Sequence, residues 1–318
     1  ALIEIIGEDI DKIYLDKAKT ILLSPESIKR HNDLKIVYTP IHGTGIKLIP
    51  RCLQEIGFTN VSLVEEQTVI SGNFPTVASP NPEEPAALDM AIQKAKAIDA
   101  DIVMASDPDA DRMGIAVKND KGEWMLVNGN QTDLMFTYYI IRRRKELGLL
   151  KGNEFMVKTI VTSELVKTIC DKNNVELFDC YTGFKWIAAV VRDMEGKKQY
   201  IGGGEESYGY MPAEFVRDKD AVACCALMAE MTAWAKDNGK TIFEMLQDIY
   251  LEYGYSKEKG ISVVRLGKTG AEEIVAMMKN FRQNPPKEIA GSAVKVIKDY
   301  QSQEMIDVAT GKVTKMNF

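Results

Sequence analysis

The sequence lacks an excess of positive charge. Lys and Arg number 40 against 46 Asp and Glu, which gives a formal net charge of −6, whereas a nucleic-acid-binding domain is normally basic. The one basic run, residues 142–145, follows an apolar stretch. We interpret it as a solvated helix end, where cations offset the negative pole of the helix, and we expect no nucleic-acid partner.

Long apolar runs and paired cysteine motifs are also missing. No apolar run reaches 18 residues and no signal peptide is recognisable, so we expect neither a membrane span nor secretion. The five cysteines form no Cys-x-x-Cys pair, and Cys224 and Cys225 adjoin within an apolar helical stretch, where thiols behave as small hydrophobic groups. These features predict a reduced, cytoplasmic protein.

What the sequence does contain is an alternation of strand-like and helix-like segments. In the first part, short apolar runs at 34–39, 61–66 and 100–106 alternate with helical spacing at 46–57 and 83–100. The alternation restarts after Val127 and continues to a long helix from Ala221 (strands expected at 155–161, 175–181 and 199–204, helices at 131–147 and 163–173). This order is typical of helices that cover a mainly parallel sheet.

We therefore predict an α/β protein with consecutive three-layer α/β/α domains at 1–127 and 128–255, each with a mainly parallel, mixed sheet. Residues 256–318 begin with a linker-like segment and then contain a strand at 261–266, a helix at 270–281 and a strand at 293–300. These elements are too few for a normal core, which predicts the truncated start of a further α+β domain.

The stretch ASDPDADRMGI places Asp107, Asp109 and Asp111 at alternate positions directly after a predicted buried strand. Close carboxylates repel one another unless a cation lies among them, and open α/β sheets bind ligands where strands end. Oxygen-only ligation favours Mg²⁺. The structural alternative is an acidic turn with local Asx hydrogen bonds.

Two other kinds of aspartate loop do not fit this spacing. An EF-hand needs Gly at its sixth position and Glu at its twelfth, which are Arg112 and Lys118 here. A haloacid-dehalogenase motif, Asp-x-Asp-x-Thr, would have Thr where Asp111 stands.

Three further segments carry polar groups suited to a ligand pocket. GGGEESYGY (202–210) follows a predicted strand, and its Glu205 and Ser207 could hold vicinal sugar hydroxyls; a glycine-rich turn with surface glutamates is the alternative. YTGFKW (181–186) combines a glycine turn with an aromatic ring and a lysine. RDKD (217–220) precedes the long helix, for which Asp220 could simply be the N-cap.

Together these segments resemble the α-D-phosphohexomutase family (phosphoglucomutase and phosphomannomutase), in particular its phosphoglucomutase–phosphopentomutase branch. DPDADR resembles the metal loop of the family, GEES its sugar-recognition loop, and TGFK and RDKD other active-site segments. YTPIHGTG and SPNPEEP resemble stretches of its second domain. The resemblance covers nearly the whole chain, which would correspond to the second and third domains and part of the fourth.

The resemblance implies an isomerase that acts as an intramolecular phosphotransferase. It would interconvert sugar 1-phosphate and 6-phosphate through a phosphoserine enzyme and a bisphosphorylated intermediate, with Mg²⁺ as metal and a sugar 1,6-bisphosphate as activator. Glucose, mannose and pentose phosphates all remain open as substrates, although the GEES form favours glucose. A non-catalytic sugar-phosphate-binding protein and a Mg²⁺-dependent phosphatase are the alternatives.

The resemblance also assigns roles to single residues. Asp107, Asp109 and Asp111 would bind Mg²⁺, Arg112 would hold a phosphate oxygen, and Lys219 would act as general acid/base. The substrate-binding residues would be Glu205, Ser207, Gly183, Lys185, Lys158 and His42. For His42, a role in stabilising its own turn is an equal alternative.

Two segments of the family are missing from residues 1–318. There is no Ser-His-Asn-Pro phosphoserine loop and no Arg-x-Ser-Gly-Thr phosphate loop. Ser79 precedes Pro-Asn-Pro, but it lacks the histidine and belongs to the domain that carries the aspartates. We therefore expect no mutase turnover from these residues alone.

Overall fold

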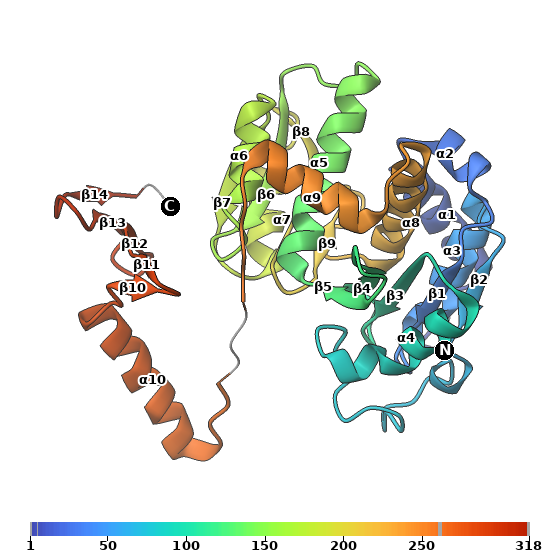
Figure 1. Ribbon diagram of the computed structural model, residues 1–318, viewed down its shortest axis with the longest axis horizontal. Coiled ribbons are helices and arrows are strands. Elements are labelled where there is room, and N and C mark those ends of the chain that lie inside the picture. Colours follow the sequence, from blue (N-terminus) through green and yellow to red (C-terminus); the bar gives the residue numbers. More distant parts are fainter. Residues whose placement is uncertain (1, 5, 260–262, 317–318) are drawn as a thin grey trace. The chain divides into compact units, whose positions relative to one another are not determined.

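The computed structural model describes residues 2–4, 6–259 and 263–316 (Figure 1). The chain divides into two compact units, Ala1–Glu258 and Lys259–Phe318. The boundary between them falls within the segment 256–260 that the sequence predicts to be a linker. Among the described residues, no helix combines the length and the apolar character needed to cross a bilayer.

The first unit contains a five-stranded sheet in the order β2–β1–β3–β4–β5. Strands β1 (Ile36–Thr39), β2 (Val61–Leu63) and β3 (Ile102–Ser106) are parallel, as predicted, whereas β4 (Met113–Lys118) and β5 (Trp124–Val127) add antiparallel pairs. The predicted mainly parallel, mixed sheet is therefore confirmed.

Alternate residues of β1 and β3 pack into different cores. Tyr38 and Met104 belong to the larger core, whereas Val37 and Val103 belong to a smaller one with helix α4 (Pro85–Ile98). Strands buried on both faces appear in a sequence as continuous apolar runs, which explains why these two were predictable.

The second sheet of this unit has the order β7–β6–β8–β9. Strands β6 (Glu154–Thr159), β7 (Glu176–Cys180) and β8 (Gln199–Gly204) are parallel, and the short β9 (Tyr210–Met211) pairs antiparallel with β8. Helix α7 (Phe184–Met194) packs on one face, where its apolar side chains join those of all four strands in a separate core.

Helix α8 (Ala221–Asp237) connects the two sheets. Every residue from Ala221 to Ala235 is buried, as expected of a helix that is apolar on all sides. The helix contacts strands β3, β4 and β9, and it also contacts three N-terminal helices, α1 (Glu8–Lys19), α2 (Pro25–Arg30) and α3 (Ile49–Ile56). One apolar core therefore includes residues from both sheets, and the domain division at residue 127 stays a prediction.

Helix α5 (Gly129–Glu146) starts the second part of the unit and packs beside α6 (Leu165–Lys172) and α9 (Ile242–Tyr253). Asn128 and Gln131 form its capping box. The basic run lies in its last turn, as predicted, but it is not fully solvated. Arg143 Nε donates to Ser24 Oγ at 2.7 Å, because α5 ends against the segment that precedes α2.

The second unit has an α+β composition, as predicted. It contains α10 (Gly267–Gln283), the hairpin of β10 (Glu288–Ile289) and β11 (Ser292–Ala293), and the antiparallel strands β12 (Val296–Asp299), β13 (Glu304–Asp307) and β14 (Val313–Lys315). The strand predicted at 261–266 begins outside the described residues, and residues 263–266 form no strand. Gly270 is the one buried residue of α10, so among the described residues no apolar core packs against this helix.

Candidate active site

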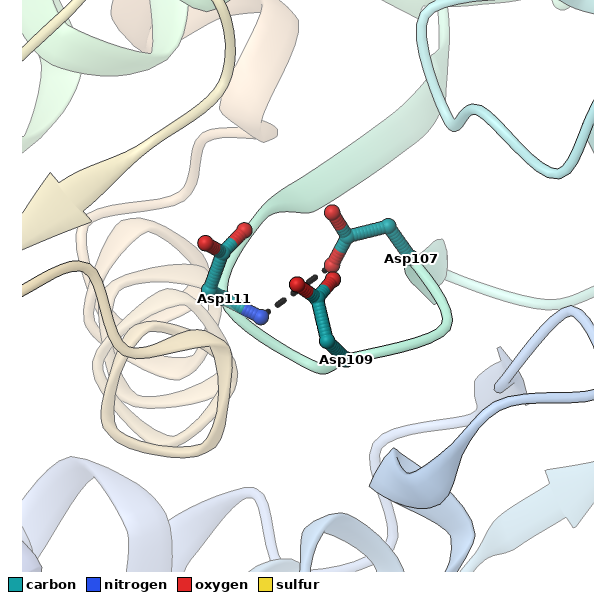
Figure 2. A group of neighbouring side chains, drawn as sticks. All are labelled: Asp107, Asp109 and Asp111. Carbon is teal, nitrogen blue, oxygen red and sulfur yellow. Dashed lines mark hydrogen bonds between the residues drawn. The ribbon is translucent and has the colours of Figure 1, made fainter. Parts of the chain in front are cut away.

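The three aspartates lie together in the loop between β3 and β4. One carboxylate oxygen of each lies within 4.8 Å of those of the other two, and Figure 2 shows the carboxylates of Asp107 and Asp109 close together, with that of Asp111 at the other end of the loop. Asp107 is buried and its Oδ1 accepts a hydrogen bond from the Asp111 backbone at 3.1 Å. Three convergent carboxylates are the donor set that hard divalent cations prefer, so this loop fits the metal that the resemblance implies.

Arg112 holds the loop closed. Its backbone N–H donates to Asp107 Oδ1 at 3.0 Å and its Nε donates to Asp107 Oδ2 at 2.7 Å. Its Nη1 also lies 3.5 Å from Glu83 Oε1, in the SPNPEEP segment. Burial raises the pKa of Asp107 to about 6, although the Arg112 hydrogen bonds act to lower it.

Lys219 reaches this cluster from the RDKD segment. Its Nζ lies 2.9 Å from Asp111 Oδ2 and 3.3 Å from Asp218 Oδ1. The same ammonium group lies 4.9 Å from the centre of the Phe184 ring, within cation–π range. Partial burial acts to lower the pKa of Lys219, but the bond to Asp111 and the nearby carboxylates outweigh it and raise that pKa. Lys219 is therefore held as a cation.

The GEES segment connects β8 to β9 and pairs with the strand that leaves the aspartate loop. Arg112 and Gly209 form an antiparallel bridge, and the Met113 N–H donates to Tyr208 O at 3.1 Å. The Glu205 N–H donates to Gly209 O at 2.9 Å, which folds the segment into a tight turn. This pairing brings the predicted sugar loop and the predicted metal loop side by side.

The carboxylate of Glu205 lies inside this turn. The residue is only 8% exposed, and burial raises its pKa, while Lys219 and a hydrogen bond from Ser207 act to lower it. Its neighbour Glu206 has a different contact, since Oε2 accepts from Thr159 Oγ1 at 2.9 Å at the end of β6. Glu205 is thus beside Lys219, and Glu206 anchors the loop to the sheet.

Gly209 leaves room for these contacts. A Cβ atom at this position would lie 2.2 Å from Lys219 Cδ and 2.9 Å from Glu205 Oε1, both far below van der Waals distance. The lysine stem therefore crosses Gly209 between Glu205 and Asp111. As a result, the aspartate loop and the segments TGFK, GGGEESYGY and RDKD, which are distant from one another in the sequence, meet around Lys219.

Gly183 and Lys185 flank this meeting point. Gly183 precedes α7 with a φ of 111°, a conformation that favours glycine, and this turn positions the next residue, Phe184, against Lys219. Lys185 is exposed, and its Nζ lies 5.5 Å from the centre of the Trp186 ring. Their roles in substrate binding stay predictions.

The Lys158 side chain is held inside the second sheet. It is fully buried in β6, and its Nζ lies 3.0 Å from Asp179 Oδ1 and 3.3 Å from the carbonyl oxygens of Thr159 and Thr162. These partners neutralise and satisfy the ammonium group inside the second sheet. The contacts favour a structural role for Lys158, and substrate binding by it stays a prediction.

Both ring nitrogens of His42 form hydrogen bonds with nearby residues. Nδ1 bonds Val69 O and Nε2 bonds Thr76 Oγ1, both at 2.9 Å. These contacts favour the turn-stabilising alternative. The HGTG segment still supports the site, because the Thr44 N–H donates to Pro108 O at 2.8 Å in the aspartate loop.

Sequence reasoning missed one buried acid under the sugar loop. Asp133, in α5, is buried; its Oδ1 accepts from Thr137 Oγ1 at 3.4 Å, and its Oδ2 has no partner within the described residues. A Cβ on Gly204 would lie 3.4 Å from its Cγ. Burial raises the pKa of Asp133 to about 7. A lone aspartate within an apolar helical stretch was the available signal.

Replacing Asp133 by Asn is expected to flatten the pH dependence of stability. Because the folded pKa of Asp133 is about 7 and the unfolded value is near 3.9, this group favours folding most at low pH. That contribution is lost as the pH rises toward 7. Asp133→Asn should therefore gain about 1–3 kcal/mol over wild type between pH 5 and pH 8. Urea unfolding of both proteins at the two pH values measures this gain, and a constant difference would contradict it.

Comparisons with known proteins match most of the chain to one family. Residues 12–122 match the family described as phosphoglucomutase/phosphomannomutase, alpha/beta/alpha domain II, and residues 128–253 match its domain III. The phosphoglucomutase of Staphylococcus haemolyticus (strain JCSC1435) is 37% identical over 271 residues, which is 85% of this chain and 49% of the relative. That of Staphylococcus aureus (strain USA300) is 37% identical over 286 residues, 90% of this chain and 51% of the relative.

Solved structures show the same fold. Pp63/parafusin, a phosphoglucomutase of Paramecium in its open form, aligns with a TM-score of 0.61 at 16% identity and covers 96% of this chain and 51% of its own. A phosphoglucomutase/phosphomannomutase family protein of Burkholderia thailandensis aligns with a TM-score of 0.58 at 21% identity, over 76% and 46%. The chain thus spans about half the length of the curated relatives it matches. It belongs to the phosphoglucomutase/phosphomannomutase family, with residues 12–122 and 128–253 as its domains II and III.

Proposed function

We propose that this chain supplies the metal-binding and sugar-binding parts of a phosphosugar mutase that interconverts glucose 1-phosphate and glucose 6-phosphate. The observation that carries the proposal is the convergence of the aspartate loop, Lys219 and Glu205 at one place. Family membership favours this function over a sugar phosphatase or a non-catalytic binding protein. The cytoplasm is the proposed location.

The charged residues would position and neutralise the phosphoryl group. Phosphoryl transfer depends on orientation and charge compensation more than on covalent chemistry by the protein. Mg²⁺ held by Asp107, Asp109 and Asp111 would supply positive charge to the phosphoryl oxygens. Arg112 carries a permanent, planar charge and would bind one of these oxygens from the same loop.

Lys219 and Glu205 would act on the sugar. Lys219, held as a cation, would give a proton to the oxygen that leaves the phosphoryl group. The neutral amine that this step produces would then take the proton of the attacking hydroxyl, so that Lys219 ends as a cation again. Glu205 and Ser207 would accept and donate hydrogen bonds to neighbouring sugar hydroxyls, which look alike in both orientations of a bisphosphorylated intermediate. The donor phosphoserine is expected on a Ser-His-Asn-Pro segment, which residues 1–318 do not contain.

The direct test of the function is a turnover assay. A protein that joins this chain to both missing loops should form glucose 6-phosphate from glucose 1-phosphate with Mg²⁺ and catalytic glucose 1,6-bisphosphate, at roughly 1–10³ s⁻¹. Residues 1–318 alone should show no turnover. Turnover by these residues alone would place the nucleophile within them, and Ser79 would be the first residue to replace.

Asp109→Ala is expected to weaken Mg²⁺ binding by about tenfold or more, which corresponds to about 1.4 kcal/mol. Asp109 is exposed and is the simplest of the three ligands to remove, since Asp107 also holds Arg112 and Asp111 also holds Lys219. Isothermal titration of residues 1–318 with Mg²⁺ measures the change. Asp120→Ala removes an exposed aspartate on the β4–β5 turn and is the control. Equal affinities of the two variants would remove Asp109 from the site.

A further inference from the structure

We propose that Lys219 competes with the divalent cation for Asp111, so that cation binding releases the Lys219 ammonium group toward the sugar phosphate. This inference rests on the proposed function, because it takes the three aspartates as the metal ligands. It adds a coupling between the metal site and the residue that would exchange protons with the substrate.

The competition follows from a shared carboxylate. Lys219 Nζ lies 2.9 Å from Asp111 Oδ2, a contact that uses a carboxylate of the three-aspartate cluster. An ammonium group and a divalent cation repel each other, so that each weakens the binding of the other to the same carboxylate. A cation that takes Asp111 as ligand therefore has to displace Lys219 from it or bind less tightly.

The two cations beside the cluster differ in how firmly they are held. Arg112 is fixed to Asp107 by its backbone N–H and its Nε, and it also faces Glu83. Lys219 holds Asp111 through one nitrogen at the end of a flexible four-carbon chain. Lys219 is therefore the cation that can leave while the loop keeps its shape.

The released ammonium group would still have partners. Asp218 Oδ1 lies 3.3 Å from Nζ and the centre of the Phe184 ring lies 4.9 Å from it. The lysine stem already runs over Gly209, next to Glu205 Oε1, so a change of side-chain torsion moves the charge along the sugar loop. Release from Asp111 thus leaves no buried charge unpaired and brings Nζ to the proposed substrate hydroxyls.

Exchange of Lys219 for a divalent cation makes the charge of the aspartate loop less negative, which favours the approach of a phosphoryl group. Three carboxylates with Arg112 and Lys219 amount to a formal charge of −1, and exchange of Lys219 for a divalent cation makes the loop neutral. Two cations would then oppose the negative charge of the phosphoryl group, the divalent cation at the loop and the Lys219 ammonium group beside the sugar. The coupling is reciprocal. The factor by which Lys219 weakens cation binding equals the factor by which the bound cation weakens the contact between Lys219 and Asp111.

Metal affinity tests this coupling without an activity assay. We would titrate residues 1–318 with Mn²⁺ and follow free Mn²⁺ by electron paramagnetic resonance, for wild type, Lys219→Met and Lys47→Met. Methionine keeps the length of the stem and removes the charge. Lys47 is an exposed lysine in η1 (Thr44–Lys47), the segment whose Thr44 contacts the aspartate loop, so it controls for a general loss of positive charge.

We expect Lys219→Met to bind Mn²⁺ about tenfold more tightly than wild type and Lys47→Met to stay within about twofold of it. Reductive methylation of the wild-type protein gives a second measurement, in which Mn²⁺ should accelerate labelling of Lys219 over that of Lys47. Equal Mn²⁺ affinity of Lys219→Met and wild type, with unchanged labelling, would overturn the coupling but keep the metal site. Absence of Mn²⁺ binding in both proteins would instead overturn the metal site of the proposed function, and the coupling with it.

Discussion

Gly129→Ala should disrupt the sugar loop even though alanine is the better helix former. Gly129 is the first residue of α5. A Cβ there would lie 2.0 Å from Glu206 O and 2.7 Å from Tyr208 N, so the clash is with backbone and cannot be relieved by a side-chain rotation. Overpacking of this kind costs about 1–3 kcal/mol, more than the ~1 kcal/mol that alanine gains over glycine in a helix.

The same clash is expected to reduce catalysis. The displaced segment holds Glu205 and pairs with Arg112 through Gly209. A shift of about 1 Å in a positioning segment can lower a rate by ~10²-fold, and we expect that loss in kcat/KM for a protein that carries the two missing loops. Urea unfolding of residues 1–318 measures the stability change independently of the proposed function.

Gly72→Ala is the matched control. Gly72 has an ordinary φ, and nothing lies within 4 Å of a Cβ built on it, so the substitution adds the same atom to open space. It should leave the unfolding free energy and kcat/KM close to those of wild type. If Gly129→Ala behaved like Gly72→Ala in both measurements, the packing of α5 against the sugar loop would not matter for the site.

The buried elements of the fold were the most predictable. Strands β1 and β3 are buried on both faces, and α8 is buried on all sides, so each stands out as a continuous apolar stretch. The strands β4 and β5 were not predicted. Strand β4 is an apolar run that is buried at all but its last residue, so its pattern was available in the sequence and was overlooked beside the aspartate loop. Strand β5 has intermediate burial along most of its length and gives a weaker signal.

The packing partner of α8 could not be read from its sequence. An all-apolar helix predicts burial but does not say against which sheet. The helix follows β9 of the second sheet, yet it packs against α2 and α3 beside the first. The two predicted domains therefore share one core, which is a property of long-range contacts and not of any local segment.

The sequence indicates each loop of the site separately, but it does not indicate that the loops lie together in the fold. Asp107, Asp109 and Asp111 converge because they are alternate residues of one turn, which is local information. The approach of the GEES segment depends on the bridge between Arg112 and Gly209, and that of Lys219 depends on the position of α8. The surroundings of Lys158 could not be predicted either, since a lysine within a strand gives no sign of the buried partners that hold it.

Glu205→Gln is expected to lower kcat/KM by roughly 10- to 150-fold, because a hydrogen bond to a charged group contributes about 1.5–3 kcal/mol. The glutamine keeps the shape of the side chain but loses the charge that would accept hydrogen bonds from sugar hydroxyls. Since those hydroxyls would occupy the same place in both orientations of the intermediate, the loss should be similar with glucose 1-phosphate and glucose 6-phosphate as substrate. Initial rates in both directions, for the protein that carries the two missing loops, provide the measurement.

Stability distinguishes this loss from a folding defect. Burial raises the pKa of Glu205, so its contribution to folding is greatest at low pH and is lost as the pH rises through the folded pKa. At neutral pH, glutamine removes that penalty, and the unfolding free energy of residues 1–318 should hold or rise. Glu66→Gln, at an exposed position in η2 (Glu65–Gln67), is the matched control and should leave both rates unchanged. Wild-type rates for Glu205→Gln in both directions would exclude this carboxylate from sugar recognition, while a slow and unstable variant would assign it a structural role.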